Sequence, residues 1–351
     1  MKVIINPTLP LHIDKNHDGI RLGNLPVTGK IIEGIDKNLI FLLKQCIKPV
    51  DVNKLINLCV LESRIDRQNI NETVNCLLNE RYLVDYSDYC DILHNELFNR
   101  QVLFFSMFNS FSKATSMIKV MKEKRIVILG VGAIGCNVAN QLIKAGINKL
   151  TLVDSDTVEY TNLHRQLLFK NSDVGSLKTD AAKRNLLEVN LNADIKTINI
   201  YINNEDNLEP IIKECDLVLC TMDKPTRNIV NNVCVRNDKS ILFAGFSEYV
   251  GMIGPFIIPH KTACLKCIDS SINKNINKNI NDMSINSDRI IPSFGPLCNC
   301  IASIATSEII KYISGFTDSK LIGSTLMVDL INFKMELTPW HKNNECTICS
   351  K

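Results

Sequence analysis

The sequence has no run of about 18 consecutive apolar residues, which is the length that a membrane-spanning helix needs. We therefore expect no membrane partner. The apolar start of the chain is interrupted by Pro7, Pro10 and charged residues, a pattern unlike that of a secretory signal peptide. The formal net charge is only +3 over 351 residues, so the composition gives no bias toward nucleic acid.

Cysteine, by contrast, is plentiful. A chain with 14 cysteines and no signal peptide is expected to keep reduced thiols, or to bind a metal, rather than to form a disulfide scaffold. This favours a cytoplasmic protein. The length predicts one large domain with a smaller one.

The stretch from Lys124 to Asp156 has the pattern of a nucleotide-binding unit. A predicted strand, 126–129, leads into a glycine turn and a helix, and a second predicted strand, 150–153, ends at Asp154. The turn contains Gly130, Gly132 and Gly135. Glycines let backbone N–H groups approach a phosphate, and an acid at the tip of the second strand suits a ribose hydroxyl. The pattern predicts an α/β fold with a doubly wound, mainly parallel sheet and a Rossmann-like nucleotide site. It leaves NAD, FAD, a methyl donor and ATP open.

Polar and basic residues follow the second predicted strand closely, namely Asn162, Arg165, Gln166 and Lys178. A guanidinium and an ammonium suit a triphosphate, and an NAD-dependent dehydrogenase does not need them. The sequence G-x-x-x-x-G-K-[ST] is absent, which excludes the familiar kinase-type phosphate loop. These residues favour ATP.

A further carboxylate, Asp223, follows the predicted buried strand 216–220. Ligands of open α/β sheets bind beyond the carboxyl ends of the strands, so Asp223 is expected in the crevice, where it could bind Mg²⁺ beside a triphosphate. Alternatively it caps a helix that begins at Pro225, and both roles can coexist.

Two C-x-x-C pairs lie about 80 residues apart, Cys264 with Cys267 and Cys346 with Cys349. Both are expected in polar, non-helical segments. Four thiolates complete a closed tetrahedral zinc site, which leaves no position for a substrate and is therefore structural. The alternative is a redox pair.

Between the pairs, residues 271–290 are rich in Asn and Lys and contain no cysteine. This composition predicts a mobile loop, which either closes over the substrate or is a tolerated insertion. Cys298 and Cys300 precede a helix predicted over 301–313. We expect them to pack in the core, and contact with the substrate is the alternative.

The first 90 residues predict a small, winged-helix-like α+β module of strands followed by three short helices. Its sheet edge could accept an extended peptide as an additional strand, or the module serves only packing or dimerisation. Residues 91–123 predict a helical connection in which Arg100 reads as a solvated residue. Most of its apolar residues are expected in the core: Leu97, Phe98, Val102, Phe104, Phe105, Met107 and Phe108.

Together the glycine turn, D-S-D-T-V-E-Y-T-N-L-H-R-Q, D-V-G-S-L-K, T-M-D-K-P and the two C-x-x-C pairs resemble the ubiquitin-activating-enzyme-like superfamily of ThiF, MoeB and HesA. The resemblance covers 95–351 and implies an adenylation domain over 124–351 that uses ATP and Mg²⁺ on a C-terminal carboxylate. It implies that Asp154 holds the ribose, with Asp156 beside it, and that Asp223 positions Mg²⁺. Asn162, Arg165, Gln166 and Lys178 would bind the phosphates. Ala133 replaces the second glycine of the usual pair, which the turn should tolerate.

The segment around Arg100 resembles one that carries an arginine to the γ-phosphate of the partner subunit, which implies a homodimer. The N-terminal module narrows the resemblance to MccB- and PaaA-type enzymes of microcin C and pantocin A biosynthesis, where it recognises the leader of a ribosomally made precursor peptide. Such enzymes work without a thioester cysteine, in agreement with the cysteine-free 271–290 segment. The implied function is adenylation of a precursor-peptide carboxylate with release of pyrophosphate, followed by cyclisation, dehydration or formation of another bond. Activation of a ubiquitin-like sulfur carrier and a nucleotide-binding regulator without chemistry remain as alternatives.

Overall fold

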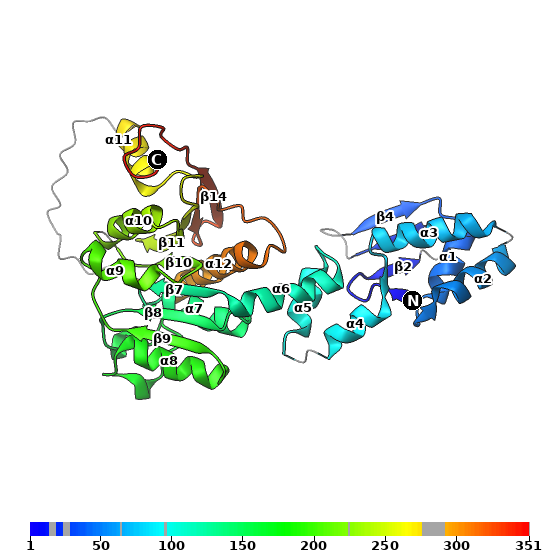
Figure 1. The fold of residues 1–351 in the computed structure, drawn as a ribbon, viewed down its shortest axis with the longest axis horizontal. Helices are drawn as coiled ribbons and strands as arrows, with labels where there is room; N and C mark the ends of the chain where they lie inside the picture. The colour runs from blue at the N-terminus through cyan, green and yellow to red at the C-terminus, as the bar shows by residue number, and fades with distance from the viewer. Residues whose placement is uncertain are drawn as a thin grey trace. The chain divides into compact units, whose positions relative to one another are not determined.

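The computed structural model describes residues 1–13, 19–23, 29–63, 65–94, 97–223, 225–275 and 292–350. By their internal contacts these residues form two compact units, Met1–Ile118 and Lys119–Lys351 (Figure 1).

The first unit begins with two small antiparallel sheets and three helices, as far as its residues are described. The strand order is β5-β1-β6 in one sheet and β2-β3-β4 in the other. The predicted strands and helices are found, except that a short strand, β5, lies where the second helix was expected to start. The first strand joins a separate sheet because Val3, which is fully buried, pairs with β5 between the first two helices and with β6 after the third. The elements are β1 (Lys2–Ile5), β2 (Leu11–Ile13), β3 (Gly19–Leu22), β4 (Lys30–Glu33), α1 (Lys37–Gln45), β5 (Val50–Asp51), α2 (Val52–Ser63), α3 (Arg67–Asn79) and β6 (Leu83–Asp85).

A helical segment follows, with α4 (Tyr86–Leu93), α5 (Asn99–Ser106) and α6 (Phe111–Glu123). The prediction that most of its apolar residues are core was wrong for four of them. Phe98, Val102 and Phe105 are buried at helical spacing and form one face of α5. The other four are between 44% and 76% exposed, because Phe104 lies off that face and the rest lie beyond the ends of α5: Leu97, Phe104, Met107 and Phe108.

The second unit is built on an eight-stranded sheet, in the part of the chain that the structure describes, with the order β14-β13-β12-β11-β10-β7-β8-β9. The strands from β11 to β9 are parallel, and β12, β13 and β14 continue the sheet antiparallel, which confirms the mainly parallel prediction. The strands are β7 (Arg125–Leu129), β8 (Lys149–Val153), β9 (Asp194–Ile198), β10 (Leu217–Cys220), β11 (Ser240–Ser247), β12 (Val250–Ile257), β13 (Ser324–Asp329) and β14 (Lys334–Pro339).

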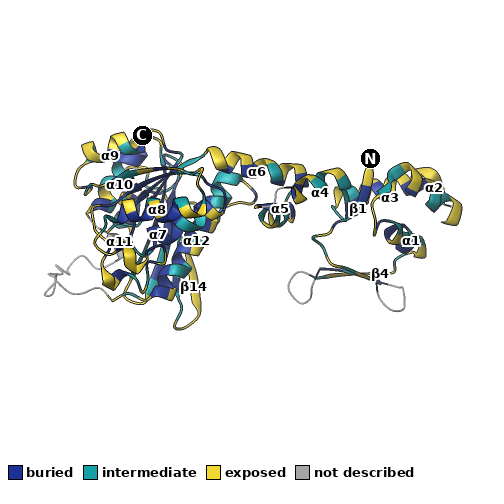
Figure 2. Ribbon diagram, turned by 90° about the horizontal axis from the view of Figure 1, so that it is seen from below, coloured by how far each residue is buried: buried dark blue, intermediate teal, exposed yellow. Residues whose placement is uncertain are grey.

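Helices cover both faces of this sheet. On one face lie α7, α8 and α12, and on the other α9 and α10 (Figures 1 and 2). The helices are α7 (Gly135–Lys144), α8 (Lys178–Val189), α9 (Glu205–Ile212), α10 (Thr226–Arg236), α11 (Leu265–Asn275) and α12 (Gly295–Ser314), with short 3₁₀ turns at Tyr160–Asn162 and Asn171–Asp173.

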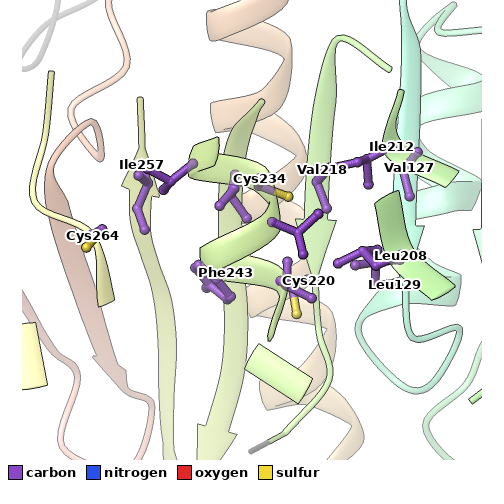
Figure 3. Packing of buried hydrophobic residues seen from close by; sticks show 14 of the residues in the cluster. Val127, Leu129, Leu208, Ile212, Val218, Cys220, Cys234, Phe243, Ile257 and Cys264 are labelled. Atoms are coloured by element: carbon purple, nitrogen blue, oxygen red, sulfur yellow. The ribbon is translucent and has the colours of Figure 1, made fainter. Parts of the chain in front are cut away.

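The core beneath α9 and α10 is formed by apolar side chains of the parallel strands and of these helices, including Val127, Val218, Leu208 and Phe243 (Figure 3). Central parallel strands are covered on both faces, which explains their continuous apolar runs. Among the described residues, no helix is both long enough and apolar enough to cross a membrane.

Two predicted boundaries were wrong. Residues 271–275 are the last turn of α11 rather than loop, and the rest of the predicted mobile segment, to 290, lies outside the described residues. The helix predicted from Ile301 begins at Gly295, so Cys298 and Cys300 lie inside α12. Cys298 is fully buried, in agreement with a packing role.

Candidate active site

A cleft of about 350 Å³ lies at the carboxyl ends of the parallel strands β7, β8 and β10. This is where an open α/β sheet binds its ligand. Six of the predicted site residues line it, and they come from four separate segments of the chain: Gly130, Gly132, Asp154, Asp156, Lys178 and Asp223.

The glycine turn is fixed by close backbone contacts. Gly130 has a φ of 93°, and a Cβ there would lie 2.6 Å from the Thr221 Oγ1. A Cβ on Gly135 would lie 1.8 Å from the Gly130 carbonyl oxygen, so this position excludes any side chain. At Gly132, no heavy atom of the described chain beyond its own sequence neighbours lies within 4 Å of a Cβ position. The first and third glycines therefore serve the fold, whereas Gly132 keeps the cleft open.

Thr221 is a functional candidate that the sequence did not single out. It directly precedes Met222 and Asp223, lines the cleft, and its hydroxyl donates to the Gly130 carbonyl over 2.9 Å. The end of β10 is thereby joined to the glycine turn. Its place in the sequence could have identified it, because Thr221 directly follows a predicted buried strand and comes two residues before the candidate ligand Asp223.

Asp154 joins the end of β8 to the same turn. Its Oδ2 accepts from the Val131 N–H over 2.7 Å, and its Oδ1 accepts from the Asp156 N–H over 2.9 Å. The residue is 8% exposed. Since each carboxylate oxygen has two acceptor sites, Asp154 can hold the turn and still accept from a hydroxyl in the cleft.

Lys178, the first residue of α8, is held by Asp156 at two points. Its Nζ lies 2.7 Å from the Asp156 Oδ2, and its backbone N–H donates to the Asp156 carbonyl over 2.9 Å. The Lys178 side chain is 10% exposed and that of Asp156 65% exposed. The ammonium is thus a preformed positive charge in the wall of the cleft.

Asp173 anchors the turn that leads to Lys178, a role that was not predicted although the residue opens the D-V-G-S-L-K motif. Its buried carboxylate accepts from the Lys170 N–H, from the Asn185 amide and from Arg184. Burial alone would raise its pKa, but these hydrogen bonds outweigh burial and lower the pKa of Asp173 below its usual value.

Asn162, Arg165 and Gln166 do not line the cleft. Asn162 is buried, and its side chain accepts from the Glu159 N–H while its carbonyl accepts from the backbone N–H groups of Arg165 and Gln166. Arg165 donates from Nη1 to the Thr161 carbonyl over 2.8 Å. Gln166 is 3% exposed, and its Oε1 has no hydrogen-bond partner among the described residues.

Asp223 is exposed at the end of β10 and faces the cleft. The alternative that it caps the following helix was wrong, because Pro225 occupies the N-cap and α10 begins at Thr226. Only its backbone carbonyl takes part, accepting from the Arg227 N–H. An oxygen donor in this position fits the preference of Mg²⁺.

Arg100 is an exposed residue of α5 in the first unit, whereas the cleft belongs to the second. The geometry within one chain therefore does not test its predicted role.

The four C-x-x-C sulfurs converge although the pairs are far apart in the sequence. The Sγ–Sγ distances are 3.9 Å for Cys264 to Cys267, 3.6 Å for Cys264 to Cys346 and 3.4 Å for Cys267 to Cys349. Four sulfurs at the Zn–S distance in a tetrahedron are about 3.8 Å apart. The set fits a closed zinc site better than two separate redox pairs.

The surroundings of the cysteines differ from the prediction. Cys267 lies in α11 rather than in a loop, and all four side chains are buried members of the core cluster, of which Figure 3 shows Cys264. Burial raises the pKa of the Cys264 thiol to about 11. Burial also acts on Cys346, but backbone N–H groups of Cys349 and Ile348 outweigh it and lower the pKa of that thiol to about 7.

Comparison with known proteins gives a family and a fold. The ThiF family model matches residues 98–348. The molybdopterin-synthase adenylyltransferase of Escherichia coli is 27% identical over 234 residues, 66% of this chain and 90% of that protein. The sulfur carrier protein adenylyltransferase of Thermus thermophilus is also 27% identical over 234 residues, 65% of this chain and 83% of that protein.

Two solved structures share the fold over nearly the whole chain. E. coli MccB, crystallised with AMPCPP and MccA, has a TM-score of 0.82 at 23% identity and covers 100% of both chains. PaaA has a TM-score of 0.72 at 21% identity, over 95% of this chain and 99% of the other.

Proposed function

We propose that this chain, which belongs to the ThiF family and has adenylyltransferases among its relatives, adenylates a carboxylate of a ribosomally made precursor peptide with ATP. The choice of substrate rests on how much of the chain each comparison matches. The family match begins at residue 98, yet the likeness to MccB includes the whole chain and therefore the N-terminal unit as well.

The cleft supports the nucleotide part of this proposal. The backbone N–H groups of the glycine turn bind phosphate, Asp154 accepts a ribose hydroxyl, and Lys178 with Arg165 neutralises phosphate charge. Asn162 and Gln166 are buried and hold the segment that carries Arg165, so they support the phosphate site from outside the cleft. Asp156 orients the Lys178 ammonium over 2.7 Å.

Asp223 would hold Mg²⁺, since it lines the cleft and its side chain is not used as a helix cap. The ion would neutralise phosphate charge there. The four cysteines would hold zinc, and their closed set of sulfurs suits a structural role that ties residues 346–349 to α11.

The first unit is proposed to dock the leader of the precursor. Strand β4 forms the edge of the β2-β3-β4 sheet, and each of its four residues is exposed. An extended peptide can pair with such an edge through backbone hydrogen bonds. Arg100, exposed on α5, is proposed to act in a homodimer on the nucleotide bound by the second copy.

The reaction follows from these parts. A substrate carboxylate oxygen attacks the α-phosphorus of ATP, a new P–O bond forms, the bond to the β-phosphate breaks, and pyrophosphate leaves. The protein supplies position and charge neutralisation rather than a covalent intermediate. The acyl-adenylate then reacts with a nucleophile, which releases AMP and gives cyclisation, dehydration or another new bond.

Exchange of radiolabelled pyrophosphate into ATP tests the proposal. We expect exchange with a peptide encoded by a short neighbouring reading frame, and none with a ubiquitin-like protein that ends in Gly-Gly. The reverse result would establish the second candidate, a sulfur-carrier activator, which the name of the Thermus relative favours.

Asp223→Ala should abolish exchange. Asp206, an exposed acid in the first turn of α9, provides the control, and Asp206→Ala should leave exchange unchanged. Exchange that survives Asp223→Ala would contradict the role of Asp223.

A further inference from the structure

Asn137 is a buried polar residue in the first turn of α7, only 3% exposed. A buried amide is costly unless its donors and its acceptor are satisfied, so its partners indicate what the residue does. Its position faces the helix α12 rather than the cleft, and neither the glycine motif nor the phosphate-binding residues predict a role for it.

The Asn137 side chain joins three separate segments. Its Nδ2 donates to the Ala133 carbonyl of the glycine turn over 2.7 Å and to the Arg165 carbonyl over 3.2 Å. Its Oδ1 accepts from the Leu167 N–H over 3.1 Å. The third segment is α12, where the Asn299 Oδ1 also accepts from Nδ2, so that three acceptors share the two N–H groups of the amide.

The segment 162–167 is therefore anchored at both ends. At its start, the Asn162 carbonyl accepts from the backbone N–H groups of Arg165 and Gln166. At its end, a side chain from another element, Asn137, links the backbone on either side of Gln166 to the glycine turn. The start of α12 packs tightly here too, since a Cβ on Gly295 would lie 2.8 Å from the His164 carbonyl.

We propose that Asn137 is a positioning residue that sets the distance between the glycine turn and the Arg165 segment, and hence between two halves of the triphosphate site. The inference rests on the proposed role of Arg165 in phosphate binding. Asn137 touches no substrate in this account and acts through the backbone of Arg165. Misplacement of a binding group by about 1 Å can cost on the order of 100-fold in rate, so the loss of this link is expected to be measurable.

Calorimetric binding of Mg·ATP to the full-length chain is the test, because it needs no peptide. We expect Asn137→Ala to weaken ATP binding by about tenfold and Arg165→Ala by at least as much. In the double variant, Asn137→Ala should add less than about twofold, since its effect passes through Arg165. The proposal would be overturned if Asn137→Ala weakened ATP binding by the same factor with and without Arg165→Ala. Unchanged ATP affinity in Asn137→Ala alone would also overturn it. Unchanged affinity in Arg165→Ala would instead refute the phosphate role of Arg165 in the proposed function.

Asn231 offers a matched control. It is 1% exposed in α10 and accepts from the Leu265 N–H over 2.9 Å, beside the cysteine cluster. Asn231→Ala should lower the melting temperature about as much as Asn137→Ala and leave ATP affinity unchanged. Amide hydrogen exchange adds a local readout, because Asn137→Ala should lose protection at Leu167 and keep it in β10.

If Asn137→Ala fails to fold, Asn137→Asp answers the same question. It keeps the shape and the acceptor for the Leu167 N–H but cannot donate to the Arg165 carbonyl. ATP affinity equal to that of the unchanged chain in Asn137→Asp would contradict the proposal, and a loss of about tenfold would support it.

Discussion

The carboxylate of Asp154, at the end of β8, accepts a 2.7 Å hydrogen bond from the backbone N–H of Val131 in the glycine turn. The acid expected to bind the nucleotide also holds the loop expected to bind its phosphates. Asp154→Ala should therefore damage both binding and stability. We expect ATP affinity to fall at least about tenfold, and the free energy of unfolding to fall by about 1–3 kcal/mol because the Val131 N–H loses its partner. Calorimetry and urea unfolding measure the two effects, and a loss of affinity at unchanged stability would contradict the structural role.

The glycine turn provides a pair of variants with opposite effects. Gly135→Ala places a Cβ 1.8 Å from the Gly130 carbonyl oxygen, so we expect a loss of at least about 3 kcal/mol in the free energy of unfolding. Gly132→Ala meets open space and should change stability by less than about 1 kcal/mol, while its methyl group enters the cleft and weakens ATP binding. Urea unfolding together with ATP calorimetry distinguishes the two. A Gly132→Ala protein with full ATP affinity would show that this backbone does not approach the phosphates.

Asp173 predicts a dependence of stability on pH. Its pKa is lower in the fold than its usual value of 3.8, since the Lys170 N–H, Asn185 and Arg184 outweigh burial. Such a carboxylate stabilises the fold above its unfolded pKa, and the stabilisation is lost as the pH falls through the lower folded value. Asp173→Asn should thus cost about 1–3 kcal/mol at neutral pH and progressively less as the pH falls below the usual value of 3.8. A cost that stays constant with pH would contradict the charged role.

The cysteine cluster predicts one zinc ion per chain. Removal of the metal by a strong chelator should lower the free energy of unfolding by at least about 3 kcal/mol, because metal that binds only the folded chain stabilises it. Cys264→Ser should lose the zinc, measured by elemental analysis, whereas Cys76→Ser should keep it, since Cys76 is exposed and lies outside the cluster. If the purified protein contained no metal and the chelator left its free energy of unfolding unchanged, the redox alternative would be favoured.

Local patterns predicted the nucleotide unit well. The apolar strands, the glycine turn and Asp154 are consecutive in the chain, so their geometry follows from their spacing. Hydrogen-bond partners that lie far apart in the sequence could not be predicted in the same way. From the sequence, no role was predicted for Asn137, whereas in the structure it is 3% exposed and bonded to Arg165 and Asn299.

The helical segment 91–123 shows the opposite failure. Its apolar residues predicted a core. The face of α5 that carries Val102 and Phe105 is buried, whereas Phe104 and Phe108 are about half exposed, with their ring centroids 5.8 Å apart. The sequence shows that the segment is rich in hydrophobic residues, but it does not show which face of the helix packs against the rest of the unit. The same holds for Cys267, whose C-x-x-C spacing predicted a metal ligand but not the helix that carries it.

The central claim is that a peptide carboxylate attacks the α-phosphorus of ATP. It is tested most directly by labelling both carboxylate oxygens of the precursor peptide with heavy oxygen and analysing the nucleotide products of the complete reaction by mass spectrometry. The account predicts one labelled oxygen in AMP and none in pyrophosphate, because the attacking oxygen stays on phosphorus when the acyl–oxygen bond breaks. Label in pyrophosphate or inorganic phosphate, or unlabelled AMP from a reaction that consumes the peptide, would contradict it.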